Sequence, residues 1–131
     1  MSSIEEQVAD ASPAQLIAML YTRAVRDLEG ACEFFSVEGN SRAQADAIRL
    51  IVHAQQIIAE LNRSLDTRDG EDLVTNLARI YEYMQYRLTE AVSKREQTPV
   101  SEVCKLLTEL RDVWAEVTGT KGVKGAAGAE V

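Results

Sequence analysis

The sequence contains few residues that interrupt helices. Of its 131 residues only two are proline and seven are glycine, and four of the glycines lie between residues 119 and 128. Glycine and proline are the residues that most disfavour a helix interior. Their scarcity from residue 13 to residue 118 favours an all-helical chain, and the length suits one domain with one hydrophobic core.

Long apolar runs and clusters of basic residues are also lacking. A membrane-spanning helix needs about 20 consecutive apolar residues, and the longest apolar runs here are only a few residues. The net charge of −7 repels a nucleic-acid backbone. The first residues, MSSIEEQVAD, have neither the basic start nor the apolar stretch of a signal peptide. We therefore expect a cytoplasmic protein with no nucleic-acid partner and no membrane insertion.

Patterns that carry catalysis or metal binding are scarce as well. His53 is the only histidine, so a di-iron helical bundle, which needs two, is excluded. Cys32 and Cys104 lack CxxC spacing and fit buried thiols in a reducing compartment. A Cys–His pair stays open as an alternative but has no local motif support. No Gly-rich phosphate loop or G-x-S-x-G motif is present, so we expect no enzyme activity, no metal and no cofactor.

The first long helix carries several start signals. Ser12 is a good N-cap, Pro13 suits the first helical position, and Gln15 completes a capping box. Gly39 is expected to end the segment. Apolar residues recur between them with a period near 3.6, at Leu16, Ile17, Leu20, Ala24, Leu28, Ala31 and Phe35.

Three further helical segments follow. The second is expected to begin with Ser41 as its N-cap, the third to follow the turn at Gly70 and run to about Ser93, and the fourth to begin with Thr98 as its N-cap. Short connections make consecutive helices antiparallel. The predicted fold is an all-α, antiparallel, up-down-up-down four-helix bundle.

The predicted bundle covers residues 11–118 of the chain. Residues 1–10 are expected to be a flexible segment or a short extra helix. Residues 119–131 are rich in glycine and alanine, and they have too little apolar bulk to offset the entropy of ordering, so they are expected to be a disordered tail.

Three of the four tyrosines lie within RIYEYMQYRL, residues 79–88. At 100° per residue, Tyr81 falls on the apolar arc of the third helix, together with Leu73, Val74, Leu77, Ile80, Met84, Leu88, Ala91 and Val92. Tyr83 and Tyr86 fall progressively farther around the helix. Their rings either cover the edge of a neighbouring helix with the hydroxyl in water, or form part of a protein-binding surface.

The other helices carry more apolar positions than one small core needs. The second helix has Leu50, Ile57 and Leu61 beside its main apolar face, and the fourth has Leu106 and Val113. A groove that receives a helix from another protein would use this surplus. A homodimer that closes over the extra faces is the alternative.

Three stretches together resemble the FliS family of flagellar export chaperones. They are ASPAQLIAMLY at 11–21, SLD at 64–66, and NLARIYEYMQYRL at 76–88. The resemblance extends from about Ala11 to Val117. It implies a helical bundle that binds the C-terminal segment of flagellin in the cytoplasm, prevents premature polymerisation, and passes the cargo to the flagellar type III export gate. It also leaves room for a co-chaperone or flagellar regulator as a further partner, and for a monomer or weak homodimer when the protein is free.

The resemblance and the surplus apolar faces together suggest a set of contact positions. The expected cargo groove comprises Ser12, Leu16, Tyr21, Leu50, Gln55, Ile57, Asn76, Tyr83, Tyr86 and Arg87. Family members commonly carry a tyrosine ahead of the A-S-P motif that folds over the empty groove. Here Ile4 and Val8 are the sizeable apolar residues of that segment after Met1, so we expect them to form the N-terminal cap. The alternative function is a self-associating adaptor or regulator of flagellar assembly without flagellin cargo.

Overall fold

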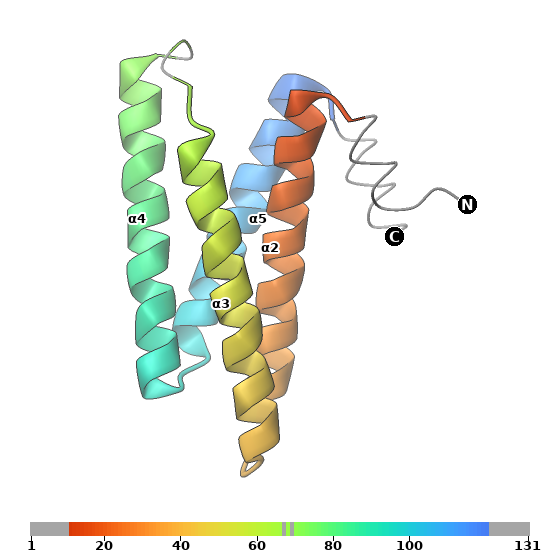
Figure 1. The fold of residues 1–131 in the computed structure, drawn as a ribbon, viewed down its shortest axis with the longest axis vertical. Helices are drawn as coiled ribbons and strands as arrows, with labels where there is room; N and C mark the ends of the chain where they lie inside the picture. The colour runs from red at the N-terminus through yellow and green to blue at the C-terminus, as the bar shows by residue number, and fades with distance from the viewer. Residues whose placement is uncertain (1–10, 67, 69, 121–131) are drawn as a thin grey trace, which may run out of the picture.

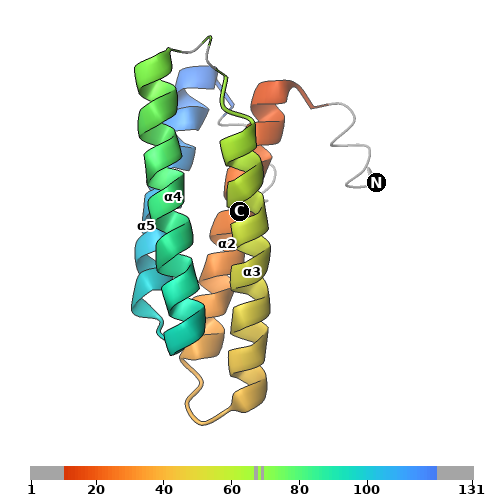
Figure 2. The same ribbon diagram turned by 60° about the vertical axis from the view of Figure 1, so that its left-hand side comes forward.

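Four long helices make up the described part of the chain. The computed structural model describes residues 11–66, 68 and 70–120, and its helices are α2 (Pro13–Phe35), α3 (Ser41–Arg63), α4 (Glu71–Lys94) and α5 (Thr98–Thr118). Consecutive helices run antiparallel (Figures 1 and 2). The main packing pairs are α2 with α3, α2 with α5, α3 with α4 and α4 with α5. The helices therefore form a ring with α2 diagonal to α4, which confirms the predicted four-helix bundle.

The helix ends correct two sequence expectations. The capping box of α2 is confirmed: Ser12 Oγ accepts from the backbone N–H of Gln15, and the Gln15 side chain accepts from the backbone N–H of Ser12. The N-cap of α3 is Asn40 rather than Ser41, because Asn40 Oδ1 accepts from the N–H of Ala43 at 3.0 Å and asparagine is among the strongest capping residues. Thr98 is not an N-cap but the first residue of α5.

The residues that cap the C-terminal end of α5 lie within the region predicted to be a disordered tail. Gly119 has φ = 71°, which is the left-handed conformation of a helix C-cap. Thr120 is buried, and its N–H donates to Ala115 O at 2.9 Å. Residues 119 and 120 thus complete the end of α5. The predictions for residues 1–10 and 121–131, including the cap formed by Ile4 and Val8, lie outside the described residues.

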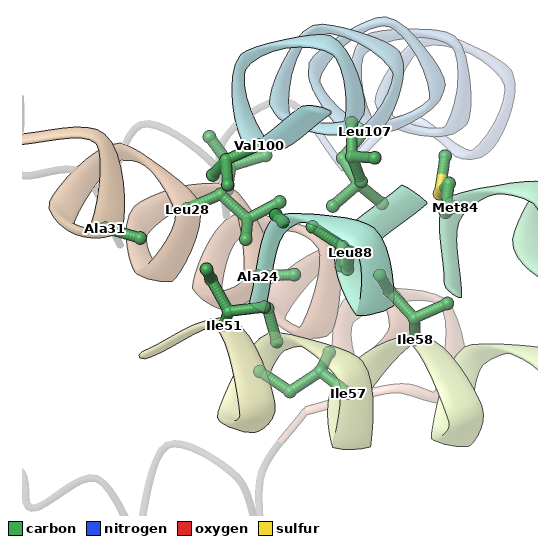
Figure 3. Close-up of a cluster of buried hydrophobic side chains, with 14 of the residues drawn as sticks. Ala24, Leu28, Ala31, Ile51, Ile57, Ile58, Met84, Leu88, Val100 and Leu107 are labelled. Atoms are coloured by element: carbon green, nitrogen blue, oxygen red, sulfur yellow. The ribbon is translucent and has the colours of Figure 1, made fainter. Parts of the chain in front are cut away.

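The bundle core is built from aliphatic side chains contributed by all four helices. Figure 3 shows Leu28 of α2, Ile51 and Ile58 of α3, Leu88 of α4 and Leu107 of α5 converging on one another, and all five are fully buried. Ile51 and Ile58 lie seven residues apart on α3, which is the spacing of an amphipathic stripe. This closely packed layer holds the helices in register.

The core is less complete toward one end of the bundle. The buried residues of α4 are Tyr81, Met84, Leu88 and Ala91, so none lies in the first ten residues of the helix. The first half of α4 and the last turns of α5 lie at the same end as the start of α2 and the end of α3 (Figures 1 and 2). We call this the open end. Trp114 connects two helices there, because its Nε1–H donates to Ala14 O at 2.9 Å.

Candidate protein-binding site

A groove lies between α4 and α5. It has a volume of about 450 Å³ and is lined by Arg79, Ile80, Tyr83, Glu102, Leu106, Glu109 and Leu110. Its apolar lining comes from both helices and packs only partly against the core. We refer to it as the α4/α5 groove.

The apolar surface continues from this groove toward the open end. Leu73 is 50% exposed and lies seven residues before Ile80, whereas Val113 is 60% exposed and lies seven residues after Leu106. Seven residues are almost two complete turns, so each pair shares one face of its helix. The two helices are antiparallel, and these faces therefore extend the groove in the same direction.

These exposed side chains correct the predicted core. The apolar periodicity assigned Leu73 of α4 to the core-facing stripe, but Leu73 is 50% exposed, and Val117 of α5 is 77% exposed as well. A helical wheel gives the direction in which a side chain points and not whether another helix reaches it. At the open end no neighbouring helix covers these two side chains among the described residues.

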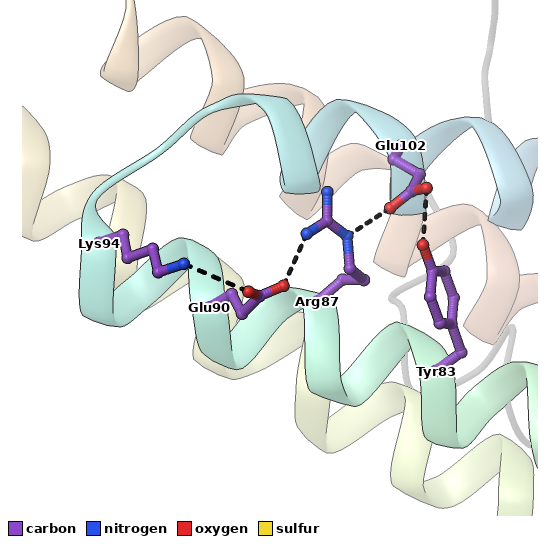
Figure 4. Close-up of polar contacts among 5 residues, drawn as sticks. All are labelled: Tyr83, Arg87, Glu90, Lys94 and Glu102. Carbon is purple, nitrogen blue, oxygen red and sulfur yellow. Dashed lines mark hydrogen bonds and ion pairs between the residues drawn. The ribbon is translucent and has the colours of Figure 1, made fainter.

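A polar network borders the groove at Tyr83, as Figure 4 shows. Tyr83 Oη donates to Glu102 Oε2 at 2.8 Å, and Arg87 Nε donates to Glu102 Oε1 at 2.6 Å. Arg87 Nη1 donates to Glu90 Oε1 at 2.6 Å, and Lys94 Nζ lies 3.5 Å from Glu90 Oε2. Arg87 thus joins a carboxylate of α5 to one of its own helix. We call Tyr83, Arg87, Glu90 and Glu102 the rim network.

The charges of the rim network reinforce one another. Hydrogen bonding to Arg87 lowers the pKa of Glu102 and of Glu90, and the same contacts raise the pKa of Arg87. The hydrogen bond to Glu102 raises the pKa of Tyr83. At neutral pH both carboxylates are therefore ionised acceptors and Tyr83 is a neutral donor.

The predicted site residues of α4 lie together on its outer side. Asn76 is exposed and lies seven residues before Tyr83, so both share the face that borders the α4/α5 groove. Arg87 is half-buried in the rim network, while Tyr83 and Tyr86 are 44% and 62% exposed. The prediction that Tyr81 is buried while Tyr83 and Tyr86 leave the core is confirmed.

The predicted site residues of α3 lie away from this groove. Leu50 is half-buried, and its Cδ1 is the atom that a side chain at Gly30 of α2 would contact, at 2.9 Å. Gln55 donates to Thr89 Oγ1 at 3.2 Å, and Gln85 donates to Gln55 O at 2.8 Å, which joins α3 to α4. Ile57 was expected at the groove surface, but its 7% exposure places it in the core.

The predicted site residues of α2 do not line the α4/α5 groove. Ser12 caps the helix, and Leu16 is half-buried. Tyr21 was expected at the groove but is buried, with its hydroxyl 2.5 Å from that of Tyr81. Burial raises the pKa of both tyrosines. This pair connects α2 to α4 across the diagonal of the bundle.

Four apolar residues that line or extend the groove were absent from the predicted cargo set, and they are Leu106, Leu110 and Val113 of α5 and Ile80 of α4. Leu106 and Val113 belonged to the surplus apolar face of the fourth helix, and their seven-residue spacing was a usable signal. Glu102 had no such signal, because its contacts with Tyr83 and Arg87 depend on how α5 is aligned with α4.

A second pocket lies between α2 and α5 and contains both cysteines. Its volume is about 770 Å³, and its lining includes Arg26, Glu33, Cys32, Cys104 and Lys105. Burial raises the pKa of Cys104 to about 11, and a thiol with that pKa is almost wholly protonated at neutral pH. The pocket therefore offers no activated nucleophile at Cys104.

His53 has a structural partner in α2. Its Nδ1 lies 2.5 Å from Asp27 Oδ2. Within residues 11–66, 68 and 70–120, no group of three or more His, Cys, Asp or Glu side chains could hold a metal ion. No helix in the described part of the chain has the length and apolar composition needed to cross a membrane.

The chain is a four-helix bundle with an apolar groove between two helices, a surface of the kind that can accept an amphipathic helix. A family model described as flagellar protein FliS matches residues 1–121. The chain belongs to the FliS family.

Curated relatives agree with this assignment. The flagellar secretion chaperone FliS of Salmonella typhimurium is 32% identical over 116 residues, covering 88% of this chain and 84% of the relative. The flagellar secretion chaperone FliSB of Pseudomonas aeruginosa is 36% identical over 115 residues, covering 86% of each chain. The corresponding FliS of Bacillus subtilis is 29% identical over 112 residues, covering 86% and 80% of the two chains.

Proposed function

We propose that this protein is a cytoplasmic flagellar export chaperone that binds the C-terminal segment of flagellin. Bound flagellin is kept from polymerising early and is delivered to the flagellar type III export apparatus. The observation that carries the proposal is the uncovered apolar surface of the α4/α5 groove, which continues through Leu73 and Val113 to the open end. Family membership and the names of the relatives support the secretion-chaperone role.

The geometry of the groove suits an amphipathic helix. Leu73 and Ile80 of α4 lie on one side of this apolar surface, Leu106 and Val113 of α5 lie on the other, and each pair spans about two turns, or about 10 Å. A bound helix with apolar residues at positions i, i+3, i+4 and i+7 matches that length and spacing. Folding of a disordered segment onto the groove costs about 2–5 kcal/mol in ordering, so the contact must combine several apolar side chains.

The side chains that border the groove supply polar and aromatic contacts. Tyr83 and Arg87 belong to the rim network, and Asn76 and Tyr86 are exposed on the same helix. Tyrosine and arginine are enriched among residues that dominate binding energy. We place the cargo contact on Asn76, Tyr83 and Tyr86 of α4 and on the apolar face of α5, and we assign Ile57 and Tyr21 a supporting role in the core.

Calorimetric titration with a peptide from the C-terminus of flagellin tests the proposal. Wild-type protein is expected to bind it with a 1:1 stoichiometry and to ignore a scrambled peptide of the same composition. Tyr83→Ala combined with Tyr86→Ala is expected to weaken binding while the helical melt stays cooperative, because both rings are exposed. Light scattering of full-length flagellin should also show delayed polymerisation in the presence of wild-type chaperone.

Two results would contradict the proposed function or its contact residues. A wild-type protein that forms a tight dimer in sedimentation and gives no heat with the peptide would instead be a self-associating bundle. Unchanged affinity in the double tyrosine variant would make those two rings scaffold, and the contact would then have to lie elsewhere on the bundle.

A further inference from the structure

The rim network and the α4/α5 groove share two side chains. Tyr83 and Glu102 both line the groove, and both take part in the chain of hydrogen bonds that continues through Arg87 to Glu90 (Figure 4). The polar network therefore acts directly on the shape of the apolar groove. Tyr83 belongs to both, because it lines the groove and its hydroxyl donates to Glu102.

Without the hydrogen bond to Glu102, the Tyr83 ring would not be held in one position beside the groove. A ring on an exposed helix face has more than one staggered rotamer available. If the ring becomes ordered only when the partner binds, the lost conformational entropy reduces the affinity. In the free protein the Tyr83 hydroxyl is already held by Glu102 Oε2 at 2.8 Å. The ordering of the ring is thus achieved on folding and not on binding.

Glu102 holds that hydroxyl because Arg87 holds Glu102. Arg87 donates hydrogen bonds from two different nitrogens, from Nε to Glu102 Oε1 and from Nη1 to Glu90 Oε1, each at 2.6 Å. A guanidinium has a rigid fork of donors that can fix two carboxylates at once, which a lysine ammonium does not provide. The side chain of Arg87 is only 25% exposed, so the fork is held against the protein surface.

We propose that Arg87 is a positioning residue for cargo binding, which acts through Glu102 to fix the Tyr83 ring as a preformed wall of the groove. This inference rests on the proposed function, because it concerns the affinity for a helix bound in the α4/α5 groove. Arg87 need not touch the cargo itself. Its contribution depends on the Tyr83 hydroxyl, and that dependence distinguishes it from a direct contact.

The test is a double-mutant cycle between Arg87→Met and Tyr83→Phe. Met keeps much of the apolar stem of Arg87 without the guanidinium, and Phe keeps the ring of Tyr83 without the hydroxyl. Each single variant is expected to weaken binding of the flagellin C-terminal peptide by about 2- to 10-fold, the cost of ordering one side chain at an interface. The double variant is expected to bind no more weakly than either single one, because both changes break the same chain of contacts.

Arg49→Met is the matched control. Arg49 is an exposed arginine of α3 paired with Asp46 at 3.0 Å, and it lies outside the groove, so its loss is expected to leave affinity unchanged. A second measurement needs no cargo: a fluorotyrosine signal from position 83 is expected to broaden or shift in Arg87→Met and to stay as in the wild type in Arg49→Met. Circular dichroism melts establish that every variant is folded.

The outcomes separate this proposal from the proposed function. Losses that add up in the double variant, or an unchanged position-83 signal in Arg87→Met, would overturn the positioning role even when the wild-type protein binds the peptide. Absence of binding by the wild-type protein would overturn the proposed function and this inference with it.

Discussion

The apolar extension of the groove can be tested by truncating one side chain on each helix. Leu73 of α4 is 50% exposed and Val113 of α5 is 60% exposed. Fully burying a leucine or valine side chain is worth about 1.5–3 kcal/mol. Covering half or slightly more of each by a bound helix is therefore worth about 1 kcal/mol per residue. Alanine removes most of that surface.

The expected loss of affinity follows from this estimate. About 1 kcal/mol corresponds to roughly a 5-fold change in Kd, so Leu73→Ala and Val113→Ala are each expected to weaken peptide binding by about that factor. The two residues lie on different helices, and their effects should be close to additive. The double variant is then expected to bind about 30-fold more weakly.

The assay is calorimetric titration with the flagellin C-terminal peptide, with Val52→Ala as the matched control. Val52 is 42% exposed on α3, which does not line the groove, so its truncation should leave Kd unchanged. Each truncation also removes the part of the side chain that packs on the protein, and a modest fall in melting temperature is expected for all three. Wild-type affinity in a folded Leu73→Ala/Val113→Ala variant would refute the assignment of the cargo to this groove.

Three further predictions concern the framework that supports the site. Tyr21→Phe leaves the buried Tyr81 hydroxyl without its partner and is expected to lower the free energy of unfolding by about 1–3 kcal/mol in urea titrations, with much of the loss recovered in Tyr21→Phe/Tyr81→Phe. Because burial raises the pKa of both tyrosines, they ionise more readily in the unfolded chain than in the folded protein. The stability that this pair contributes is therefore complete below about pH 10 and falls as the pH rises further. A free energy of unfolding that stays constant up to about pH 11 would contradict this. Ser12→Ala removes the capping box of α2 and is expected to cost about 1 kcal/mol, with faster amide exchange confined to the first turn.

Much of the fold could be predicted because its signals are local. The capping box at Ser12 and Gln15 depends on residues three apart, and the structure has both hydrogen bonds. The direction of each tyrosine of α4 depends only on the helical period, which placed Tyr81 in the core and Tyr83 and Tyr86 outside it. Asn40 and Ser41 are both good capping residues, and local preference alone did not choose between them.

The candidate site was harder to predict because it depends on what each helix meets. Leu73 and Leu88 share one apolar stripe in the sequence, but Leu88 is fully buried and Leu73 is half exposed. Ile57 shows the reverse error, since it was assigned to the surface and lies in the core. Tyr83 and Arg87 were predicted as site residues, but their contacts with Glu102 were not, because Glu102 meets them through the relative alignment of α4 and α5, which no local pattern encodes.

The apolar stripes of the helices therefore serve two purposes at different positions along the length of the bundle. Where all four helices converge, Leu28, Ile51 and Leu88 are sealed from water and supply the burial that stabilises the fold (Figure 3). Toward the open end the stripes continue without a partner, and Leu73 and Val113 keep about half of their surface in water. A fully packed open end would gain stability but leave no apolar surface for another chain. The incomplete packing is what a chaperone of this shape requires, because a bound helix can then complete a core that the protein's own helices leave unfinished.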